Sequence, residues 1–118
     1  MSMSKCYIAG PISGKSHQEV LDSFGDAAML ARSLGWHVIS PLEMDIDFDG
    51  EVNEAPTSKD KRKFARRDIH VIVNELSEEN GDVVFVLPGW DKSMGAQAEA
   101  AVAKWVMLPV LPIETLLD

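Results

Sequence analysis

The sequence is short of cysteine and of long apolar runs, and each shortage excludes a class of protein. Cys6 is the single cysteine among 118 residues, so a secreted fold held together by internal disulfides is excluded. No apolar stretch approaches the roughly 20 residues that a membrane-spanning helix needs, and the N-terminus lacks a basic segment followed by an apolar one. We therefore expect a cytoplasmic protein that has no membrane contact and that buries Cys6 in a strand.

Positive charge is scarce as well. Eleven lysines and arginines stand against 19 aspartates and glutamates, which gives a net charge of −8. Binding along a nucleic-acid polymer needs a surplus of cations, so no such partner is expected. A single nucleoside or nucleotide needs only a local pocket and is not excluded, and the acidic balance otherwise favours solubility.

Apolar residues, by contrast, are plentiful and fall in a regular pattern. They make up 46% of the chain, which is enough for one domain over residues 1–118 with a core of its own. Strands are expected at Lys5–Ala9, His37–Ser40, Val83–Leu87 and Met107–Leu111. Helices are expected at Ser16–Leu34, from Thr57 or Ser58 to Leu76, at Ser93–Val106 and at Ile113–Leu117. This alternation predicts a single-domain, Rossmann- or flavodoxin-like α/β fold, with a parallel sheet of four to five strands and helices on both faces.

Ligands of such sheets bind beyond the carboxyl ends of the strands. The loops Gly10–Lys15 and Pro88–Ser93 follow two of the expected strands, so both should lie at that edge. The candidate site is therefore sought in these loops and in the helices that follow them.

The first of these loops has a competing interpretation as a phosphate-binding P-loop. Ala9-Gly-Pro-Ile-Ser-Gly14-Lys15-Ser16 follows a strand and opens a helix, which is the context that this motif requires. Pro11 removes one backbone N–H from the loop, and the Val83–Leu87 strand ends in proline where a magnesium-binding aspartate is needed. An NTPase is therefore the weaker hypothesis, although Ser13, Gly14 and Lys15 can still contact one phosphate group.

The segment from Glu43 to Pro56 is acidic and irregular, and we expect a loop there. Asp45, Asp47 and Asp49 have the spacing of the first half of an EF-hand calcium loop. The twelfth position is Pro56 where that motif has glutamate, so calcium binding is disfavoured. The three histidines, His17, His37 and His70, have no metal-ligand spacing and are interpreted as structural or exposed.

Glu99 is the strongest candidate for a catalytic residue. At a hundred degrees per residue it points nearly opposite the polar Gln97, and its helical neighbours Gly95 and Val102 are small or apolar. A carboxylate on the face that packs against the sheet is costly unless it is paired or used. A structural ion pair is the alternative, but at the ligand edge the group can act as a nucleophile at a sugar carbon.

Ser93 precedes Glu99 by six residues, or about 9 Å along a helix. Its hydroxyl and the helix N-terminus together can bind an anion, and the separation matches that between the 5′-phosphate and the anomeric carbon of a nucleotide. Simple N-capping is the alternative role, and the two are compatible.

Four segments together carry a family resemblance. They are Tyr7-Ile-Ala-Gly-Pro11, Arg67-Asp68-Ile69, Asp82-Val-Val-Phe-Val-Leu-Pro-Gly-Trp90 and Ser93-Met-Gly-Ala-Gln-Ala-Glu99. In this order the chain resembles the nucleoside 2-deoxyribosyltransferase superfamily, and it is most similar to the short phage and bacterial members and to the 2′-deoxynucleoside 5′-phosphate N-hydrolases.

The resemblance implies a role for each of these segments. It makes Glu99 the nucleophile, Tyr7 the hydroxyl that orients it, and Asp68 the group that handles the proton of the departing base. Ser93 stands where the transferases usually have aspartate and the monophosphate hydrolases have serine, which favours a 5′-monophosphate and water as the acceptor. The implied substrate-binding residues are Gly10, Pro11, Ile12, Ser13, Gly14, Lys15, Gly89, Trp90, Ser93 and Gly95. A homodimer is implied too, and no metal or other cofactor.

Alternatives remain open at this point. The base acceptor of a transferase is not separated from water, and a nucleotide-binding module without turnover also fits the pattern. Tyr7 can be an ordinary strand aromatic, Asp68 a paired helix carboxylate, and Trp90 a residue that packs the loop and does not stack on a base.

Overall fold

Parallel strands form the centre of the computed structural model, which describes residues 3–12, 14–44 and 58–117. The described strands make one four-stranded sheet from β1 (Lys5–Ala9), β2 (His37–Ile39), β3 (Val83–Val86) and β4 (Val110–Pro112). Their spatial order is β2-β1-β3-β4, and each neighbouring pair is parallel. The predicted flavodoxin-like α/β class is confirmed.

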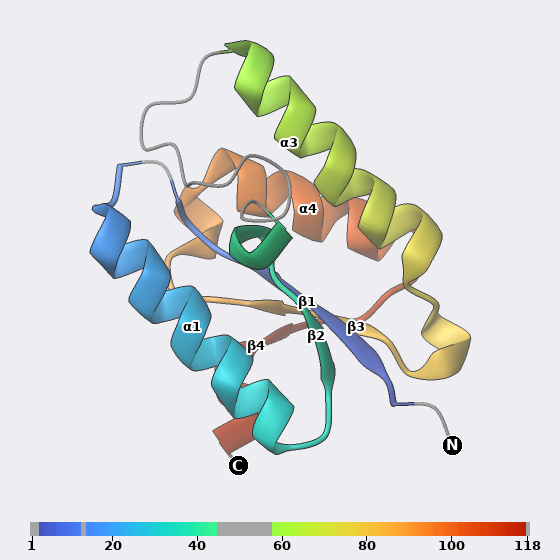
Figure 1. The fold of residues 1–118 in the computed structure, drawn as a ribbon. Coiled ribbons are helices and arrows are strands. Elements are labelled where there is room, and N and C mark those ends of the chain that lie inside the picture. The colour runs from blue at the N-terminus through green and yellow to red at the C-terminus, as the bar shows by residue number, and fades with distance from the viewer. Residues whose placement is uncertain (1–2, 13, 45–57, 118) are drawn as a thin grey trace.

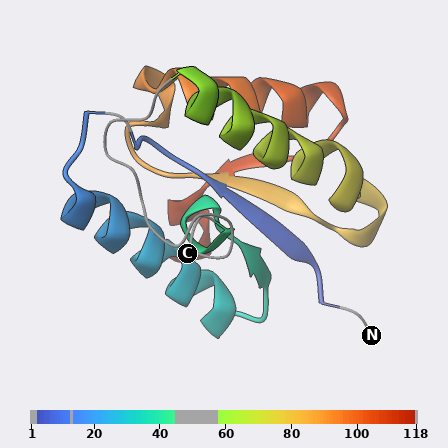
Figure 2. The ribbon, with the colours of Figure 1, turned by 45° about the horizontal axis from the view of Figure 1, so that its top comes forward.

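Helices cover both faces of this sheet (Figures 1 and 2). Helix α1 (His17–Ser33) lies on one face, and α3 (Ser58–His70) and α4 (Met94–Trp105) lie on the other. The residues of β1 from Cys6 to Ala9 and all of β3 are buried because both of their faces are covered. Cys6 is a buried free thiol, as expected, and burial raises its pKa to about 12.

The core has two halves, one on each side of the sheet. The first packs Phe24 and Ala28 of α1 against Ile8 and Phe85. The second packs Tyr7 and Val84 against the residues of the α3 and α4 layer, among them Ala96, Ala100 and Ala103. Alanines on the buried side of α4 let this helix approach the sheet closely, which brings its polar groups near β1.

Serine side chains cap α1 and α4, and the cap predicted at Ser93 is confirmed. The Ser16 hydroxyl accepts a hydrogen bond from the Glu19 N–H at the start of α1, and the Ser93 hydroxyl accepts one from the Ala96 N–H at the start of α4. Gly35 follows α1 at a φ of 95°, a left-handed conformation that favours glycine.

The expected helix ending near Leu76 changes its winding. α3 ends at His70 and continues directly as a π-helix over Val71–Glu75. The N–H of Leu76 donates to the carbonyl of Val71 over 3.2 Å, which is the five-residue spacing of that wider helix. Hydrophobic periodicity does not distinguish such a turn from an α-helix, so the sequence predicted one continuous helix.

The last strand was predicted three residues too early, at Met107–Leu111. Met107 has a φ of 71°, and the N–H of Leu108 donates to the carbonyl of Ala103 over 2.9 Å, so both residues belong to the turn that ends α4. The strand begins only at Val110. The segment Ile113–Leu117 is a 3₁₀ helix.

The expected loop beginning at Glu43 also needs correction. Residues 41–44 are helical, and Arg32 of α1 makes an ion pair with Glu43. The rest of the predicted acidic loop, including the calcium-like spacing from Asp45 to Asp49, lies outside the described residues.

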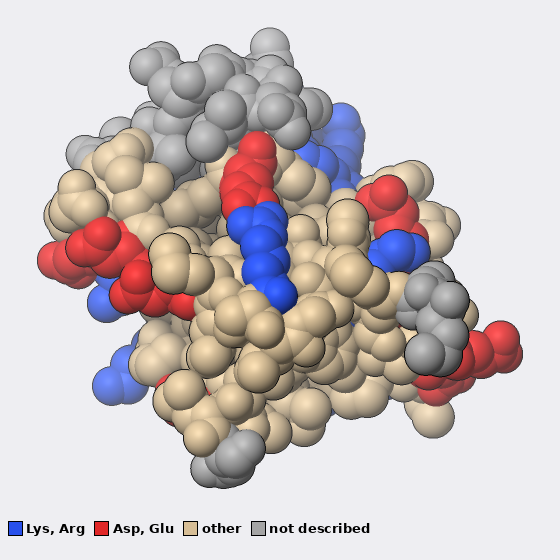
Figure 3. Space-filling model, turned by 60° about the horizontal axis from the view of Figure 1, so that its bottom comes forward, with Lys and Arg blue, Asp and Glu red and all other residues tan. Residues whose placement is uncertain are grey.

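Charge is unevenly distributed over the surface. The face drawn in Figure 3 is mostly uncharged, and an acidic and a basic side chain lie against each other at its centre. Within the described ranges, no helix is both long and apolar enough to cross a membrane.

Candidate active site

The candidate site lies where the strand order reverses. β1 is flanked by β2 on one side and β3 on the other, so the connections from β1 and β3 leave toward opposite faces and open a crevice at their carboxyl ends. The two loops that the sequence placed there do meet. A Cβ added to Gly89 would lie 3.4 Å from Cγ of Pro11, and one added to Gly10 would lie 2.8 Å from the side chain of Leu87.

Tyr7 and Glu99 form the centre of the site. Tyr7 is fully buried in β1, and its hydroxyl donates to Oε2 of Glu99 over 2.5 Å. Glu99 is half-buried on the side of α4 that carries Ala96, Ala100 and Ala103, all of them buried. The prediction that this carboxyl faces the sheet is confirmed.

Asp68 brings a second carboxyl to the same place. It is 8% exposed, and it lies close enough to Tyr7 and Glu99 for its charge to raise the pKa of both. Its Oδ1 also accepts from Nε of Arg67 over 2.9 Å and lies 2.8 Å from Nη2 of the same guanidinium. Strand β1, helix α3 and helix α4 therefore each contribute one polar group to a single cluster.

Burial controls the protonation of this cluster. Loss of solvent raises the pKa of Glu99 to about 8; the Tyr7 hydrogen bond works against that rise and the nearby Asp68 adds to it. Burial also raises the pKa of Asp68 although Arg67 opposes the rise, and it raises that of Tyr7 well above its ordinary value. Two adjacent carboxyls in a low dielectric do not both ionise readily, so near neutral pH the pair shares one proton.

Such a pair can supply an acid and a nucleophile at once. The carboxyl that holds the proton can protonate a leaving group, and the ionised one can attack an electrophilic carbon. The Tyr7 hydroxyl stabilises Glu99 as the carboxylate. Arg67 does the same for Asp68, so it opposes the proton distribution that makes Asp68 the acid.

The N-terminus of α4 forms one wall of the crevice. Ser93 caps the helix, and nothing comes within 4 Å of a Cβ added to Gly95, so space is open beside the first turn. Trp90 is partly buried against the second half of the core and has the ammonium of Lys104 6.0 Å from its ring centre. Its packing role is thus observed directly, and base stacking stays a prediction.

The loop after β1 supplies fewer clear contacts. Ile12 is partly buried and packs against the first half of the core, Gly14 has a φ of 81° and Lys15 is exposed. Ser13 lies outside the described residues. The hydroxyl of Ser16, which a P-loop would place on magnesium, caps α1 instead.

Arg67 is the site residue to which the sequence alone gave no role. Its guanidinium is 13% exposed, and it pairs with the carboxyl of the next residue in the chain. An Arg-Asp dipeptide on a helix that also carries a catalytic candidate was the available signal. No group of three or more histidine, cysteine, aspartate or glutamate side chains in the described ranges is arranged to hold a metal ion.

Fold and cluster together define the class: a flavodoxin-like α/β domain with a tyrosine and two carboxyls gathered at the switch point of its sheet. The chain belongs to the family described as "Domain of unknown function (DUF4406)", whose model matches residues 4–112. No match to a curated protein was found.

Proposed function

We propose that this protein cleaves the N-glycosidic bond of a 2′-deoxynucleoside 5′-monophosphate through a covalent intermediate on Glu99. The observation that carries the proposal is the hydrogen bond from Tyr7 to Glu99 with Asp68 beside it, at the ligand edge of the sheet. The resemblance to the nucleoside 2-deoxyribosyltransferase superfamily supports the same assignment, because Tyr7, Asp68 and Glu99 are the residues that it matches.

In the first step the Glu99 carboxylate attacks the anomeric carbon. The electron pair of the C–N bond passes to the base, and protonated Asp68 gives its proton to the departing nitrogen. The sugar phosphate is then bound to Glu99 as an ester, and Asp68 is a carboxylate.

In the second step a water molecule attacks the same carbon. Asp68 takes the proton of that water, Glu99 leaves as a carboxylate, and the sugar keeps its original anomeric configuration after two inversions. A second base in place of water would make the reaction a transfer.

The phosphate-binding part of the proposal uses the wall formed by α4. The free N–H groups and positive dipole end of α4 attract an anion, and Ser93 adds a hydroxyl and no negative charge. Gly10, Pro11 and Gly89 keep the two loops close together, and Lys15 is an exposed cation in the loop that follows β1.

Release of free base from each of the four deoxynucleoside monophosphates, followed by chromatography, tests the activity. Wild-type protein should release base, Glu99→Gln should not, and Asp68→Asn should be slower by roughly 10²–10⁴-fold. Glu114→Gln, which changes an exposed glutamate far from the cluster in sequence, is the matched control and should behave as wild type.

Two other outcomes would replace this proposal. Saturable nucleotide binding without product would indicate a binding module. Magnesium-dependent ATP hydrolysis that is lost in Lys15→Ala and retained in Glu99→Gln would indicate an NTPase.

We also propose a homodimer, which the resemblance implies. Exposed apolar side chains on α4 support it: Met94 is 86% and Trp105 84% exposed, and the exposed Ala98 and Ala101 lie between them. Light scattering should give twice the chain mass of 13.0 kDa, and a value of one chain mass would contradict the dimer.

A further inference from the structure

Helix α3 carries an unusual share of the positive charge in this acidic chain. Six of the 11 lysines and arginines fall between Ser58 and His70. Arg62 and Arg66 stand four residues apart on the helix, as do Lys63 and Arg67, so the two rows lie side by side on one face. Like charges spaced in this way destabilise an isolated helix, which points to a role outside the folding of α3.

A cavity of about 720 Å³ lies over this face. The four cationic residues Arg62, Lys63, Arg66 and Arg67 line it, with Glu75 as the acidic residue among the described lining side chains. Its volume falls in the range of small-molecule sites, roughly 300–1,000 Å³. Because the chain as a whole repels anions, a concave site with this excess of cations is a local attraction for a multiply charged ligand.

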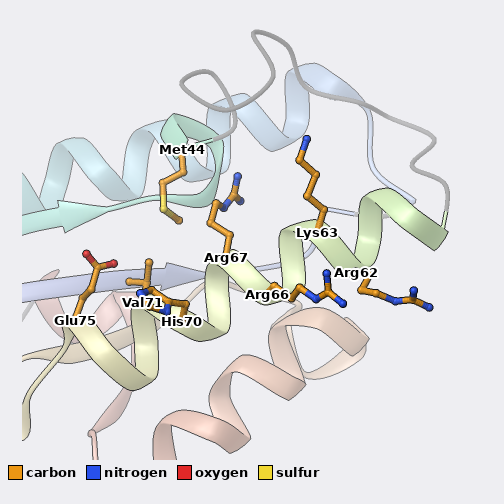
Figure 4. Close-up of a pocket in the computed structure, with 8 residues that line it drawn as sticks. All are labelled: Met44, Arg62, Lys63, Arg66, Arg67, His70, Val71 and Glu75. Carbon is orange, nitrogen blue, oxygen red and sulfur yellow. The ribbon is translucent and has the colours of Figure 1, made fainter.

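The two ends of the cavity differ in character. Figure 4 shows Arg62, Lys63 and Arg66 toward one end of the helix and Met44, Val71 and Glu75 toward the other. Arginine and lysine bind phosphate oxygens, the former in a bidentate geometry. The thioether of Met44 and the side chain of Val71 give a planar apolar group a surface to contact, and the carboxylate of Glu75 can accept a hydrogen bond from an amino group.

We propose that this cavity binds a nucleoside triphosphate, with the phosphates against Arg62, Lys63 and Arg66 and the base toward Met44 and Val71. The cavity borders the Tyr7–Asp68–Glu99 cluster at Arg67, which lines the cavity and also bonds to Asp68, but none of those three residues is among its described lining residues. The proposal does not require the catalytic function proposed above. Several phosphates in a row match several cations in a row better than a single monophosphate does. A nucleic-acid strand is disfavoured because the net charge of −8 would repel the parts of a polymer outside the cavity.

Calorimetric titration of the full chain with deoxyadenosine triphosphate tests this site. We expect saturable binding that weakens as salt is raised, and weaker binding of tripolyphosphate, which lacks the base. The Glu99→Gln variant should bind as tightly as wild type, because Glu99 does not line the cavity, and the arginine variants below decide which of the two sites is occupied.

Substitutions on α3 locate the binding. Arg66→Gln should weaken binding about tenfold, and the double variant Arg62→Gln/Arg66→Gln should weaken it about a hundredfold, given the strength of charge-assisted bonds to phosphate. Lys61→Gln is the matched control, because it removes an exposed cation from the same helix that does not line the cavity. Arg67 is left unchanged because it also bonds to Asp68.

Three results would overturn the proposal. They are no binding of the triphosphate at millimolar concentration, an equal loss in Lys61→Gln and Arg66→Gln, and binding of a short single-stranded oligonucleotide that is tighter than that of the triphosphate. Both arginines are exposed, so the variants should keep the wild-type melting temperature, and a thermal shift induced by the triphosphate gives a second measure of binding in each.

Discussion

At the scale of single residues, the account depends on how three polar groups share protons in a buried place. The Tyr7 hydroxyl cannot move away from Glu99, because the tyrosine ring is fully enclosed in the core. The bond to Glu99 therefore persists in the folded state and lowers the pKa of a carboxyl that burial raises. The opposing effects of burial and of this hydrogen bond on the pKa of Glu99 set the pH range in which Glu99 and Asp68 together hold one proton.

Removal of that hydroxyl should shift the pH profile. In Tyr7→Phe the pKa of Glu99 rises further above about 8, because a bond that stabilises the carboxylate is lost. The alkaline limb of kcat/KM, where the shared proton leaves, should move to higher pH, and the maximal rate should fall by about tenfold or more. A profile measured by base release checks this, and an unshifted limb would show that Tyr7 does not act on Glu99.

The raised pKa of Glu99 also has a consequence for stability. Between the ordinary pKa of 4.5 and about 8, the folded Glu99–Asp68 pair holds a proton that the unfolded chain has lost. The free energy of unfolding therefore decreases as the pH rises through that interval. Glu99→Gln removes this loss, so its melting temperature should exceed that of wild type by several degrees at pH 9 and by less at pH 5.

Calorimetric scans across pH test the point. If the melting temperatures of Glu99→Gln and wild type differ by the same amount at pH 5 and pH 9, the pKa of Glu99 is not raised in the folded protein. In Glu114→Gln, which lacks an exposed carboxyl, the pH dependence of melting should stay that of wild type.

At the scale of elements, much was predictable from local signals. Val83–Val86 is apolar throughout, which predicts a strand covered on both faces. Ser16 and Ser93 are residues that favour the first position of a helix, and each caps one. The end of α4 and the π-turn after His70 were not predictable, because a residue at positive φ and a five-residue hydrogen bond leave no mark on hydrophobic periodicity.

The close approach of the β1 and β3 ends is a feature that substitution can test. A Cβ on Gly10 would meet the Leu87 side chain at 2.8–3.0 Å, so Gly10→Ala should destabilise the fold by about 1–3 kcal/mol. Gly25 lies inside α1 with nothing within 4 Å of an added Cβ, so Gly25→Ala should instead stabilise by about 0.5–1 kcal/mol. Urea unfolding measures both, and equal effects would refute the packing of these strand ends.

The start of α4 determines the phosphate preference in this account. Ser93→Asp keeps a capping side chain, so the helix should remain intact. Its carboxylate would repel a 5′-phosphate, which should raise KM for a deoxynucleoside monophosphate about tenfold or more and leave turnover of the unphosphorylated nucleoside largely unchanged. Equal effects on the two substrates would show that the phosphate does not lie at Ser93.

At the scale of the whole molecule, the site exists because the topology brings distant residues together. Tyr7, Asp68 and Glu99 come from β1, α3 and α4 and meet at the switch point of the sheet. The sequence identified all three, through a helical pattern for Glu99 and through family resemblance for the others. It gave no role to Arg67, because a guanidinium that pairs with its own neighbour looks like any surface charge until the fold buries it.

The basic cavity over α3 was not predictable from the sequence either. The cations were visible in the sequence, but the total charge of −8 indicated only solubility and no affinity for a nucleic-acid polymer. Among the described residues, Met44 joins the cationic residues of α3 in lining a concave site, although it lies far from them in the sequence. Net charge does not determine the local potential of a concave site.

The covalent ester on Glu99 is the claim that the rest of the catalytic account requires. In a 2′-fluoro deoxynucleoside monophosphate the fluorine destabilises the positively charged transition state of both steps. With a base that departs readily, formation of the ester stays faster than its hydrolysis, so the ester should accumulate. Mass spectrometry of the digested protein should find the sugar phosphate on the peptide that contains Glu99, and not in Glu99→Gln. Continued release of base with no adduct, or an adduct on another residue, would contradict the account.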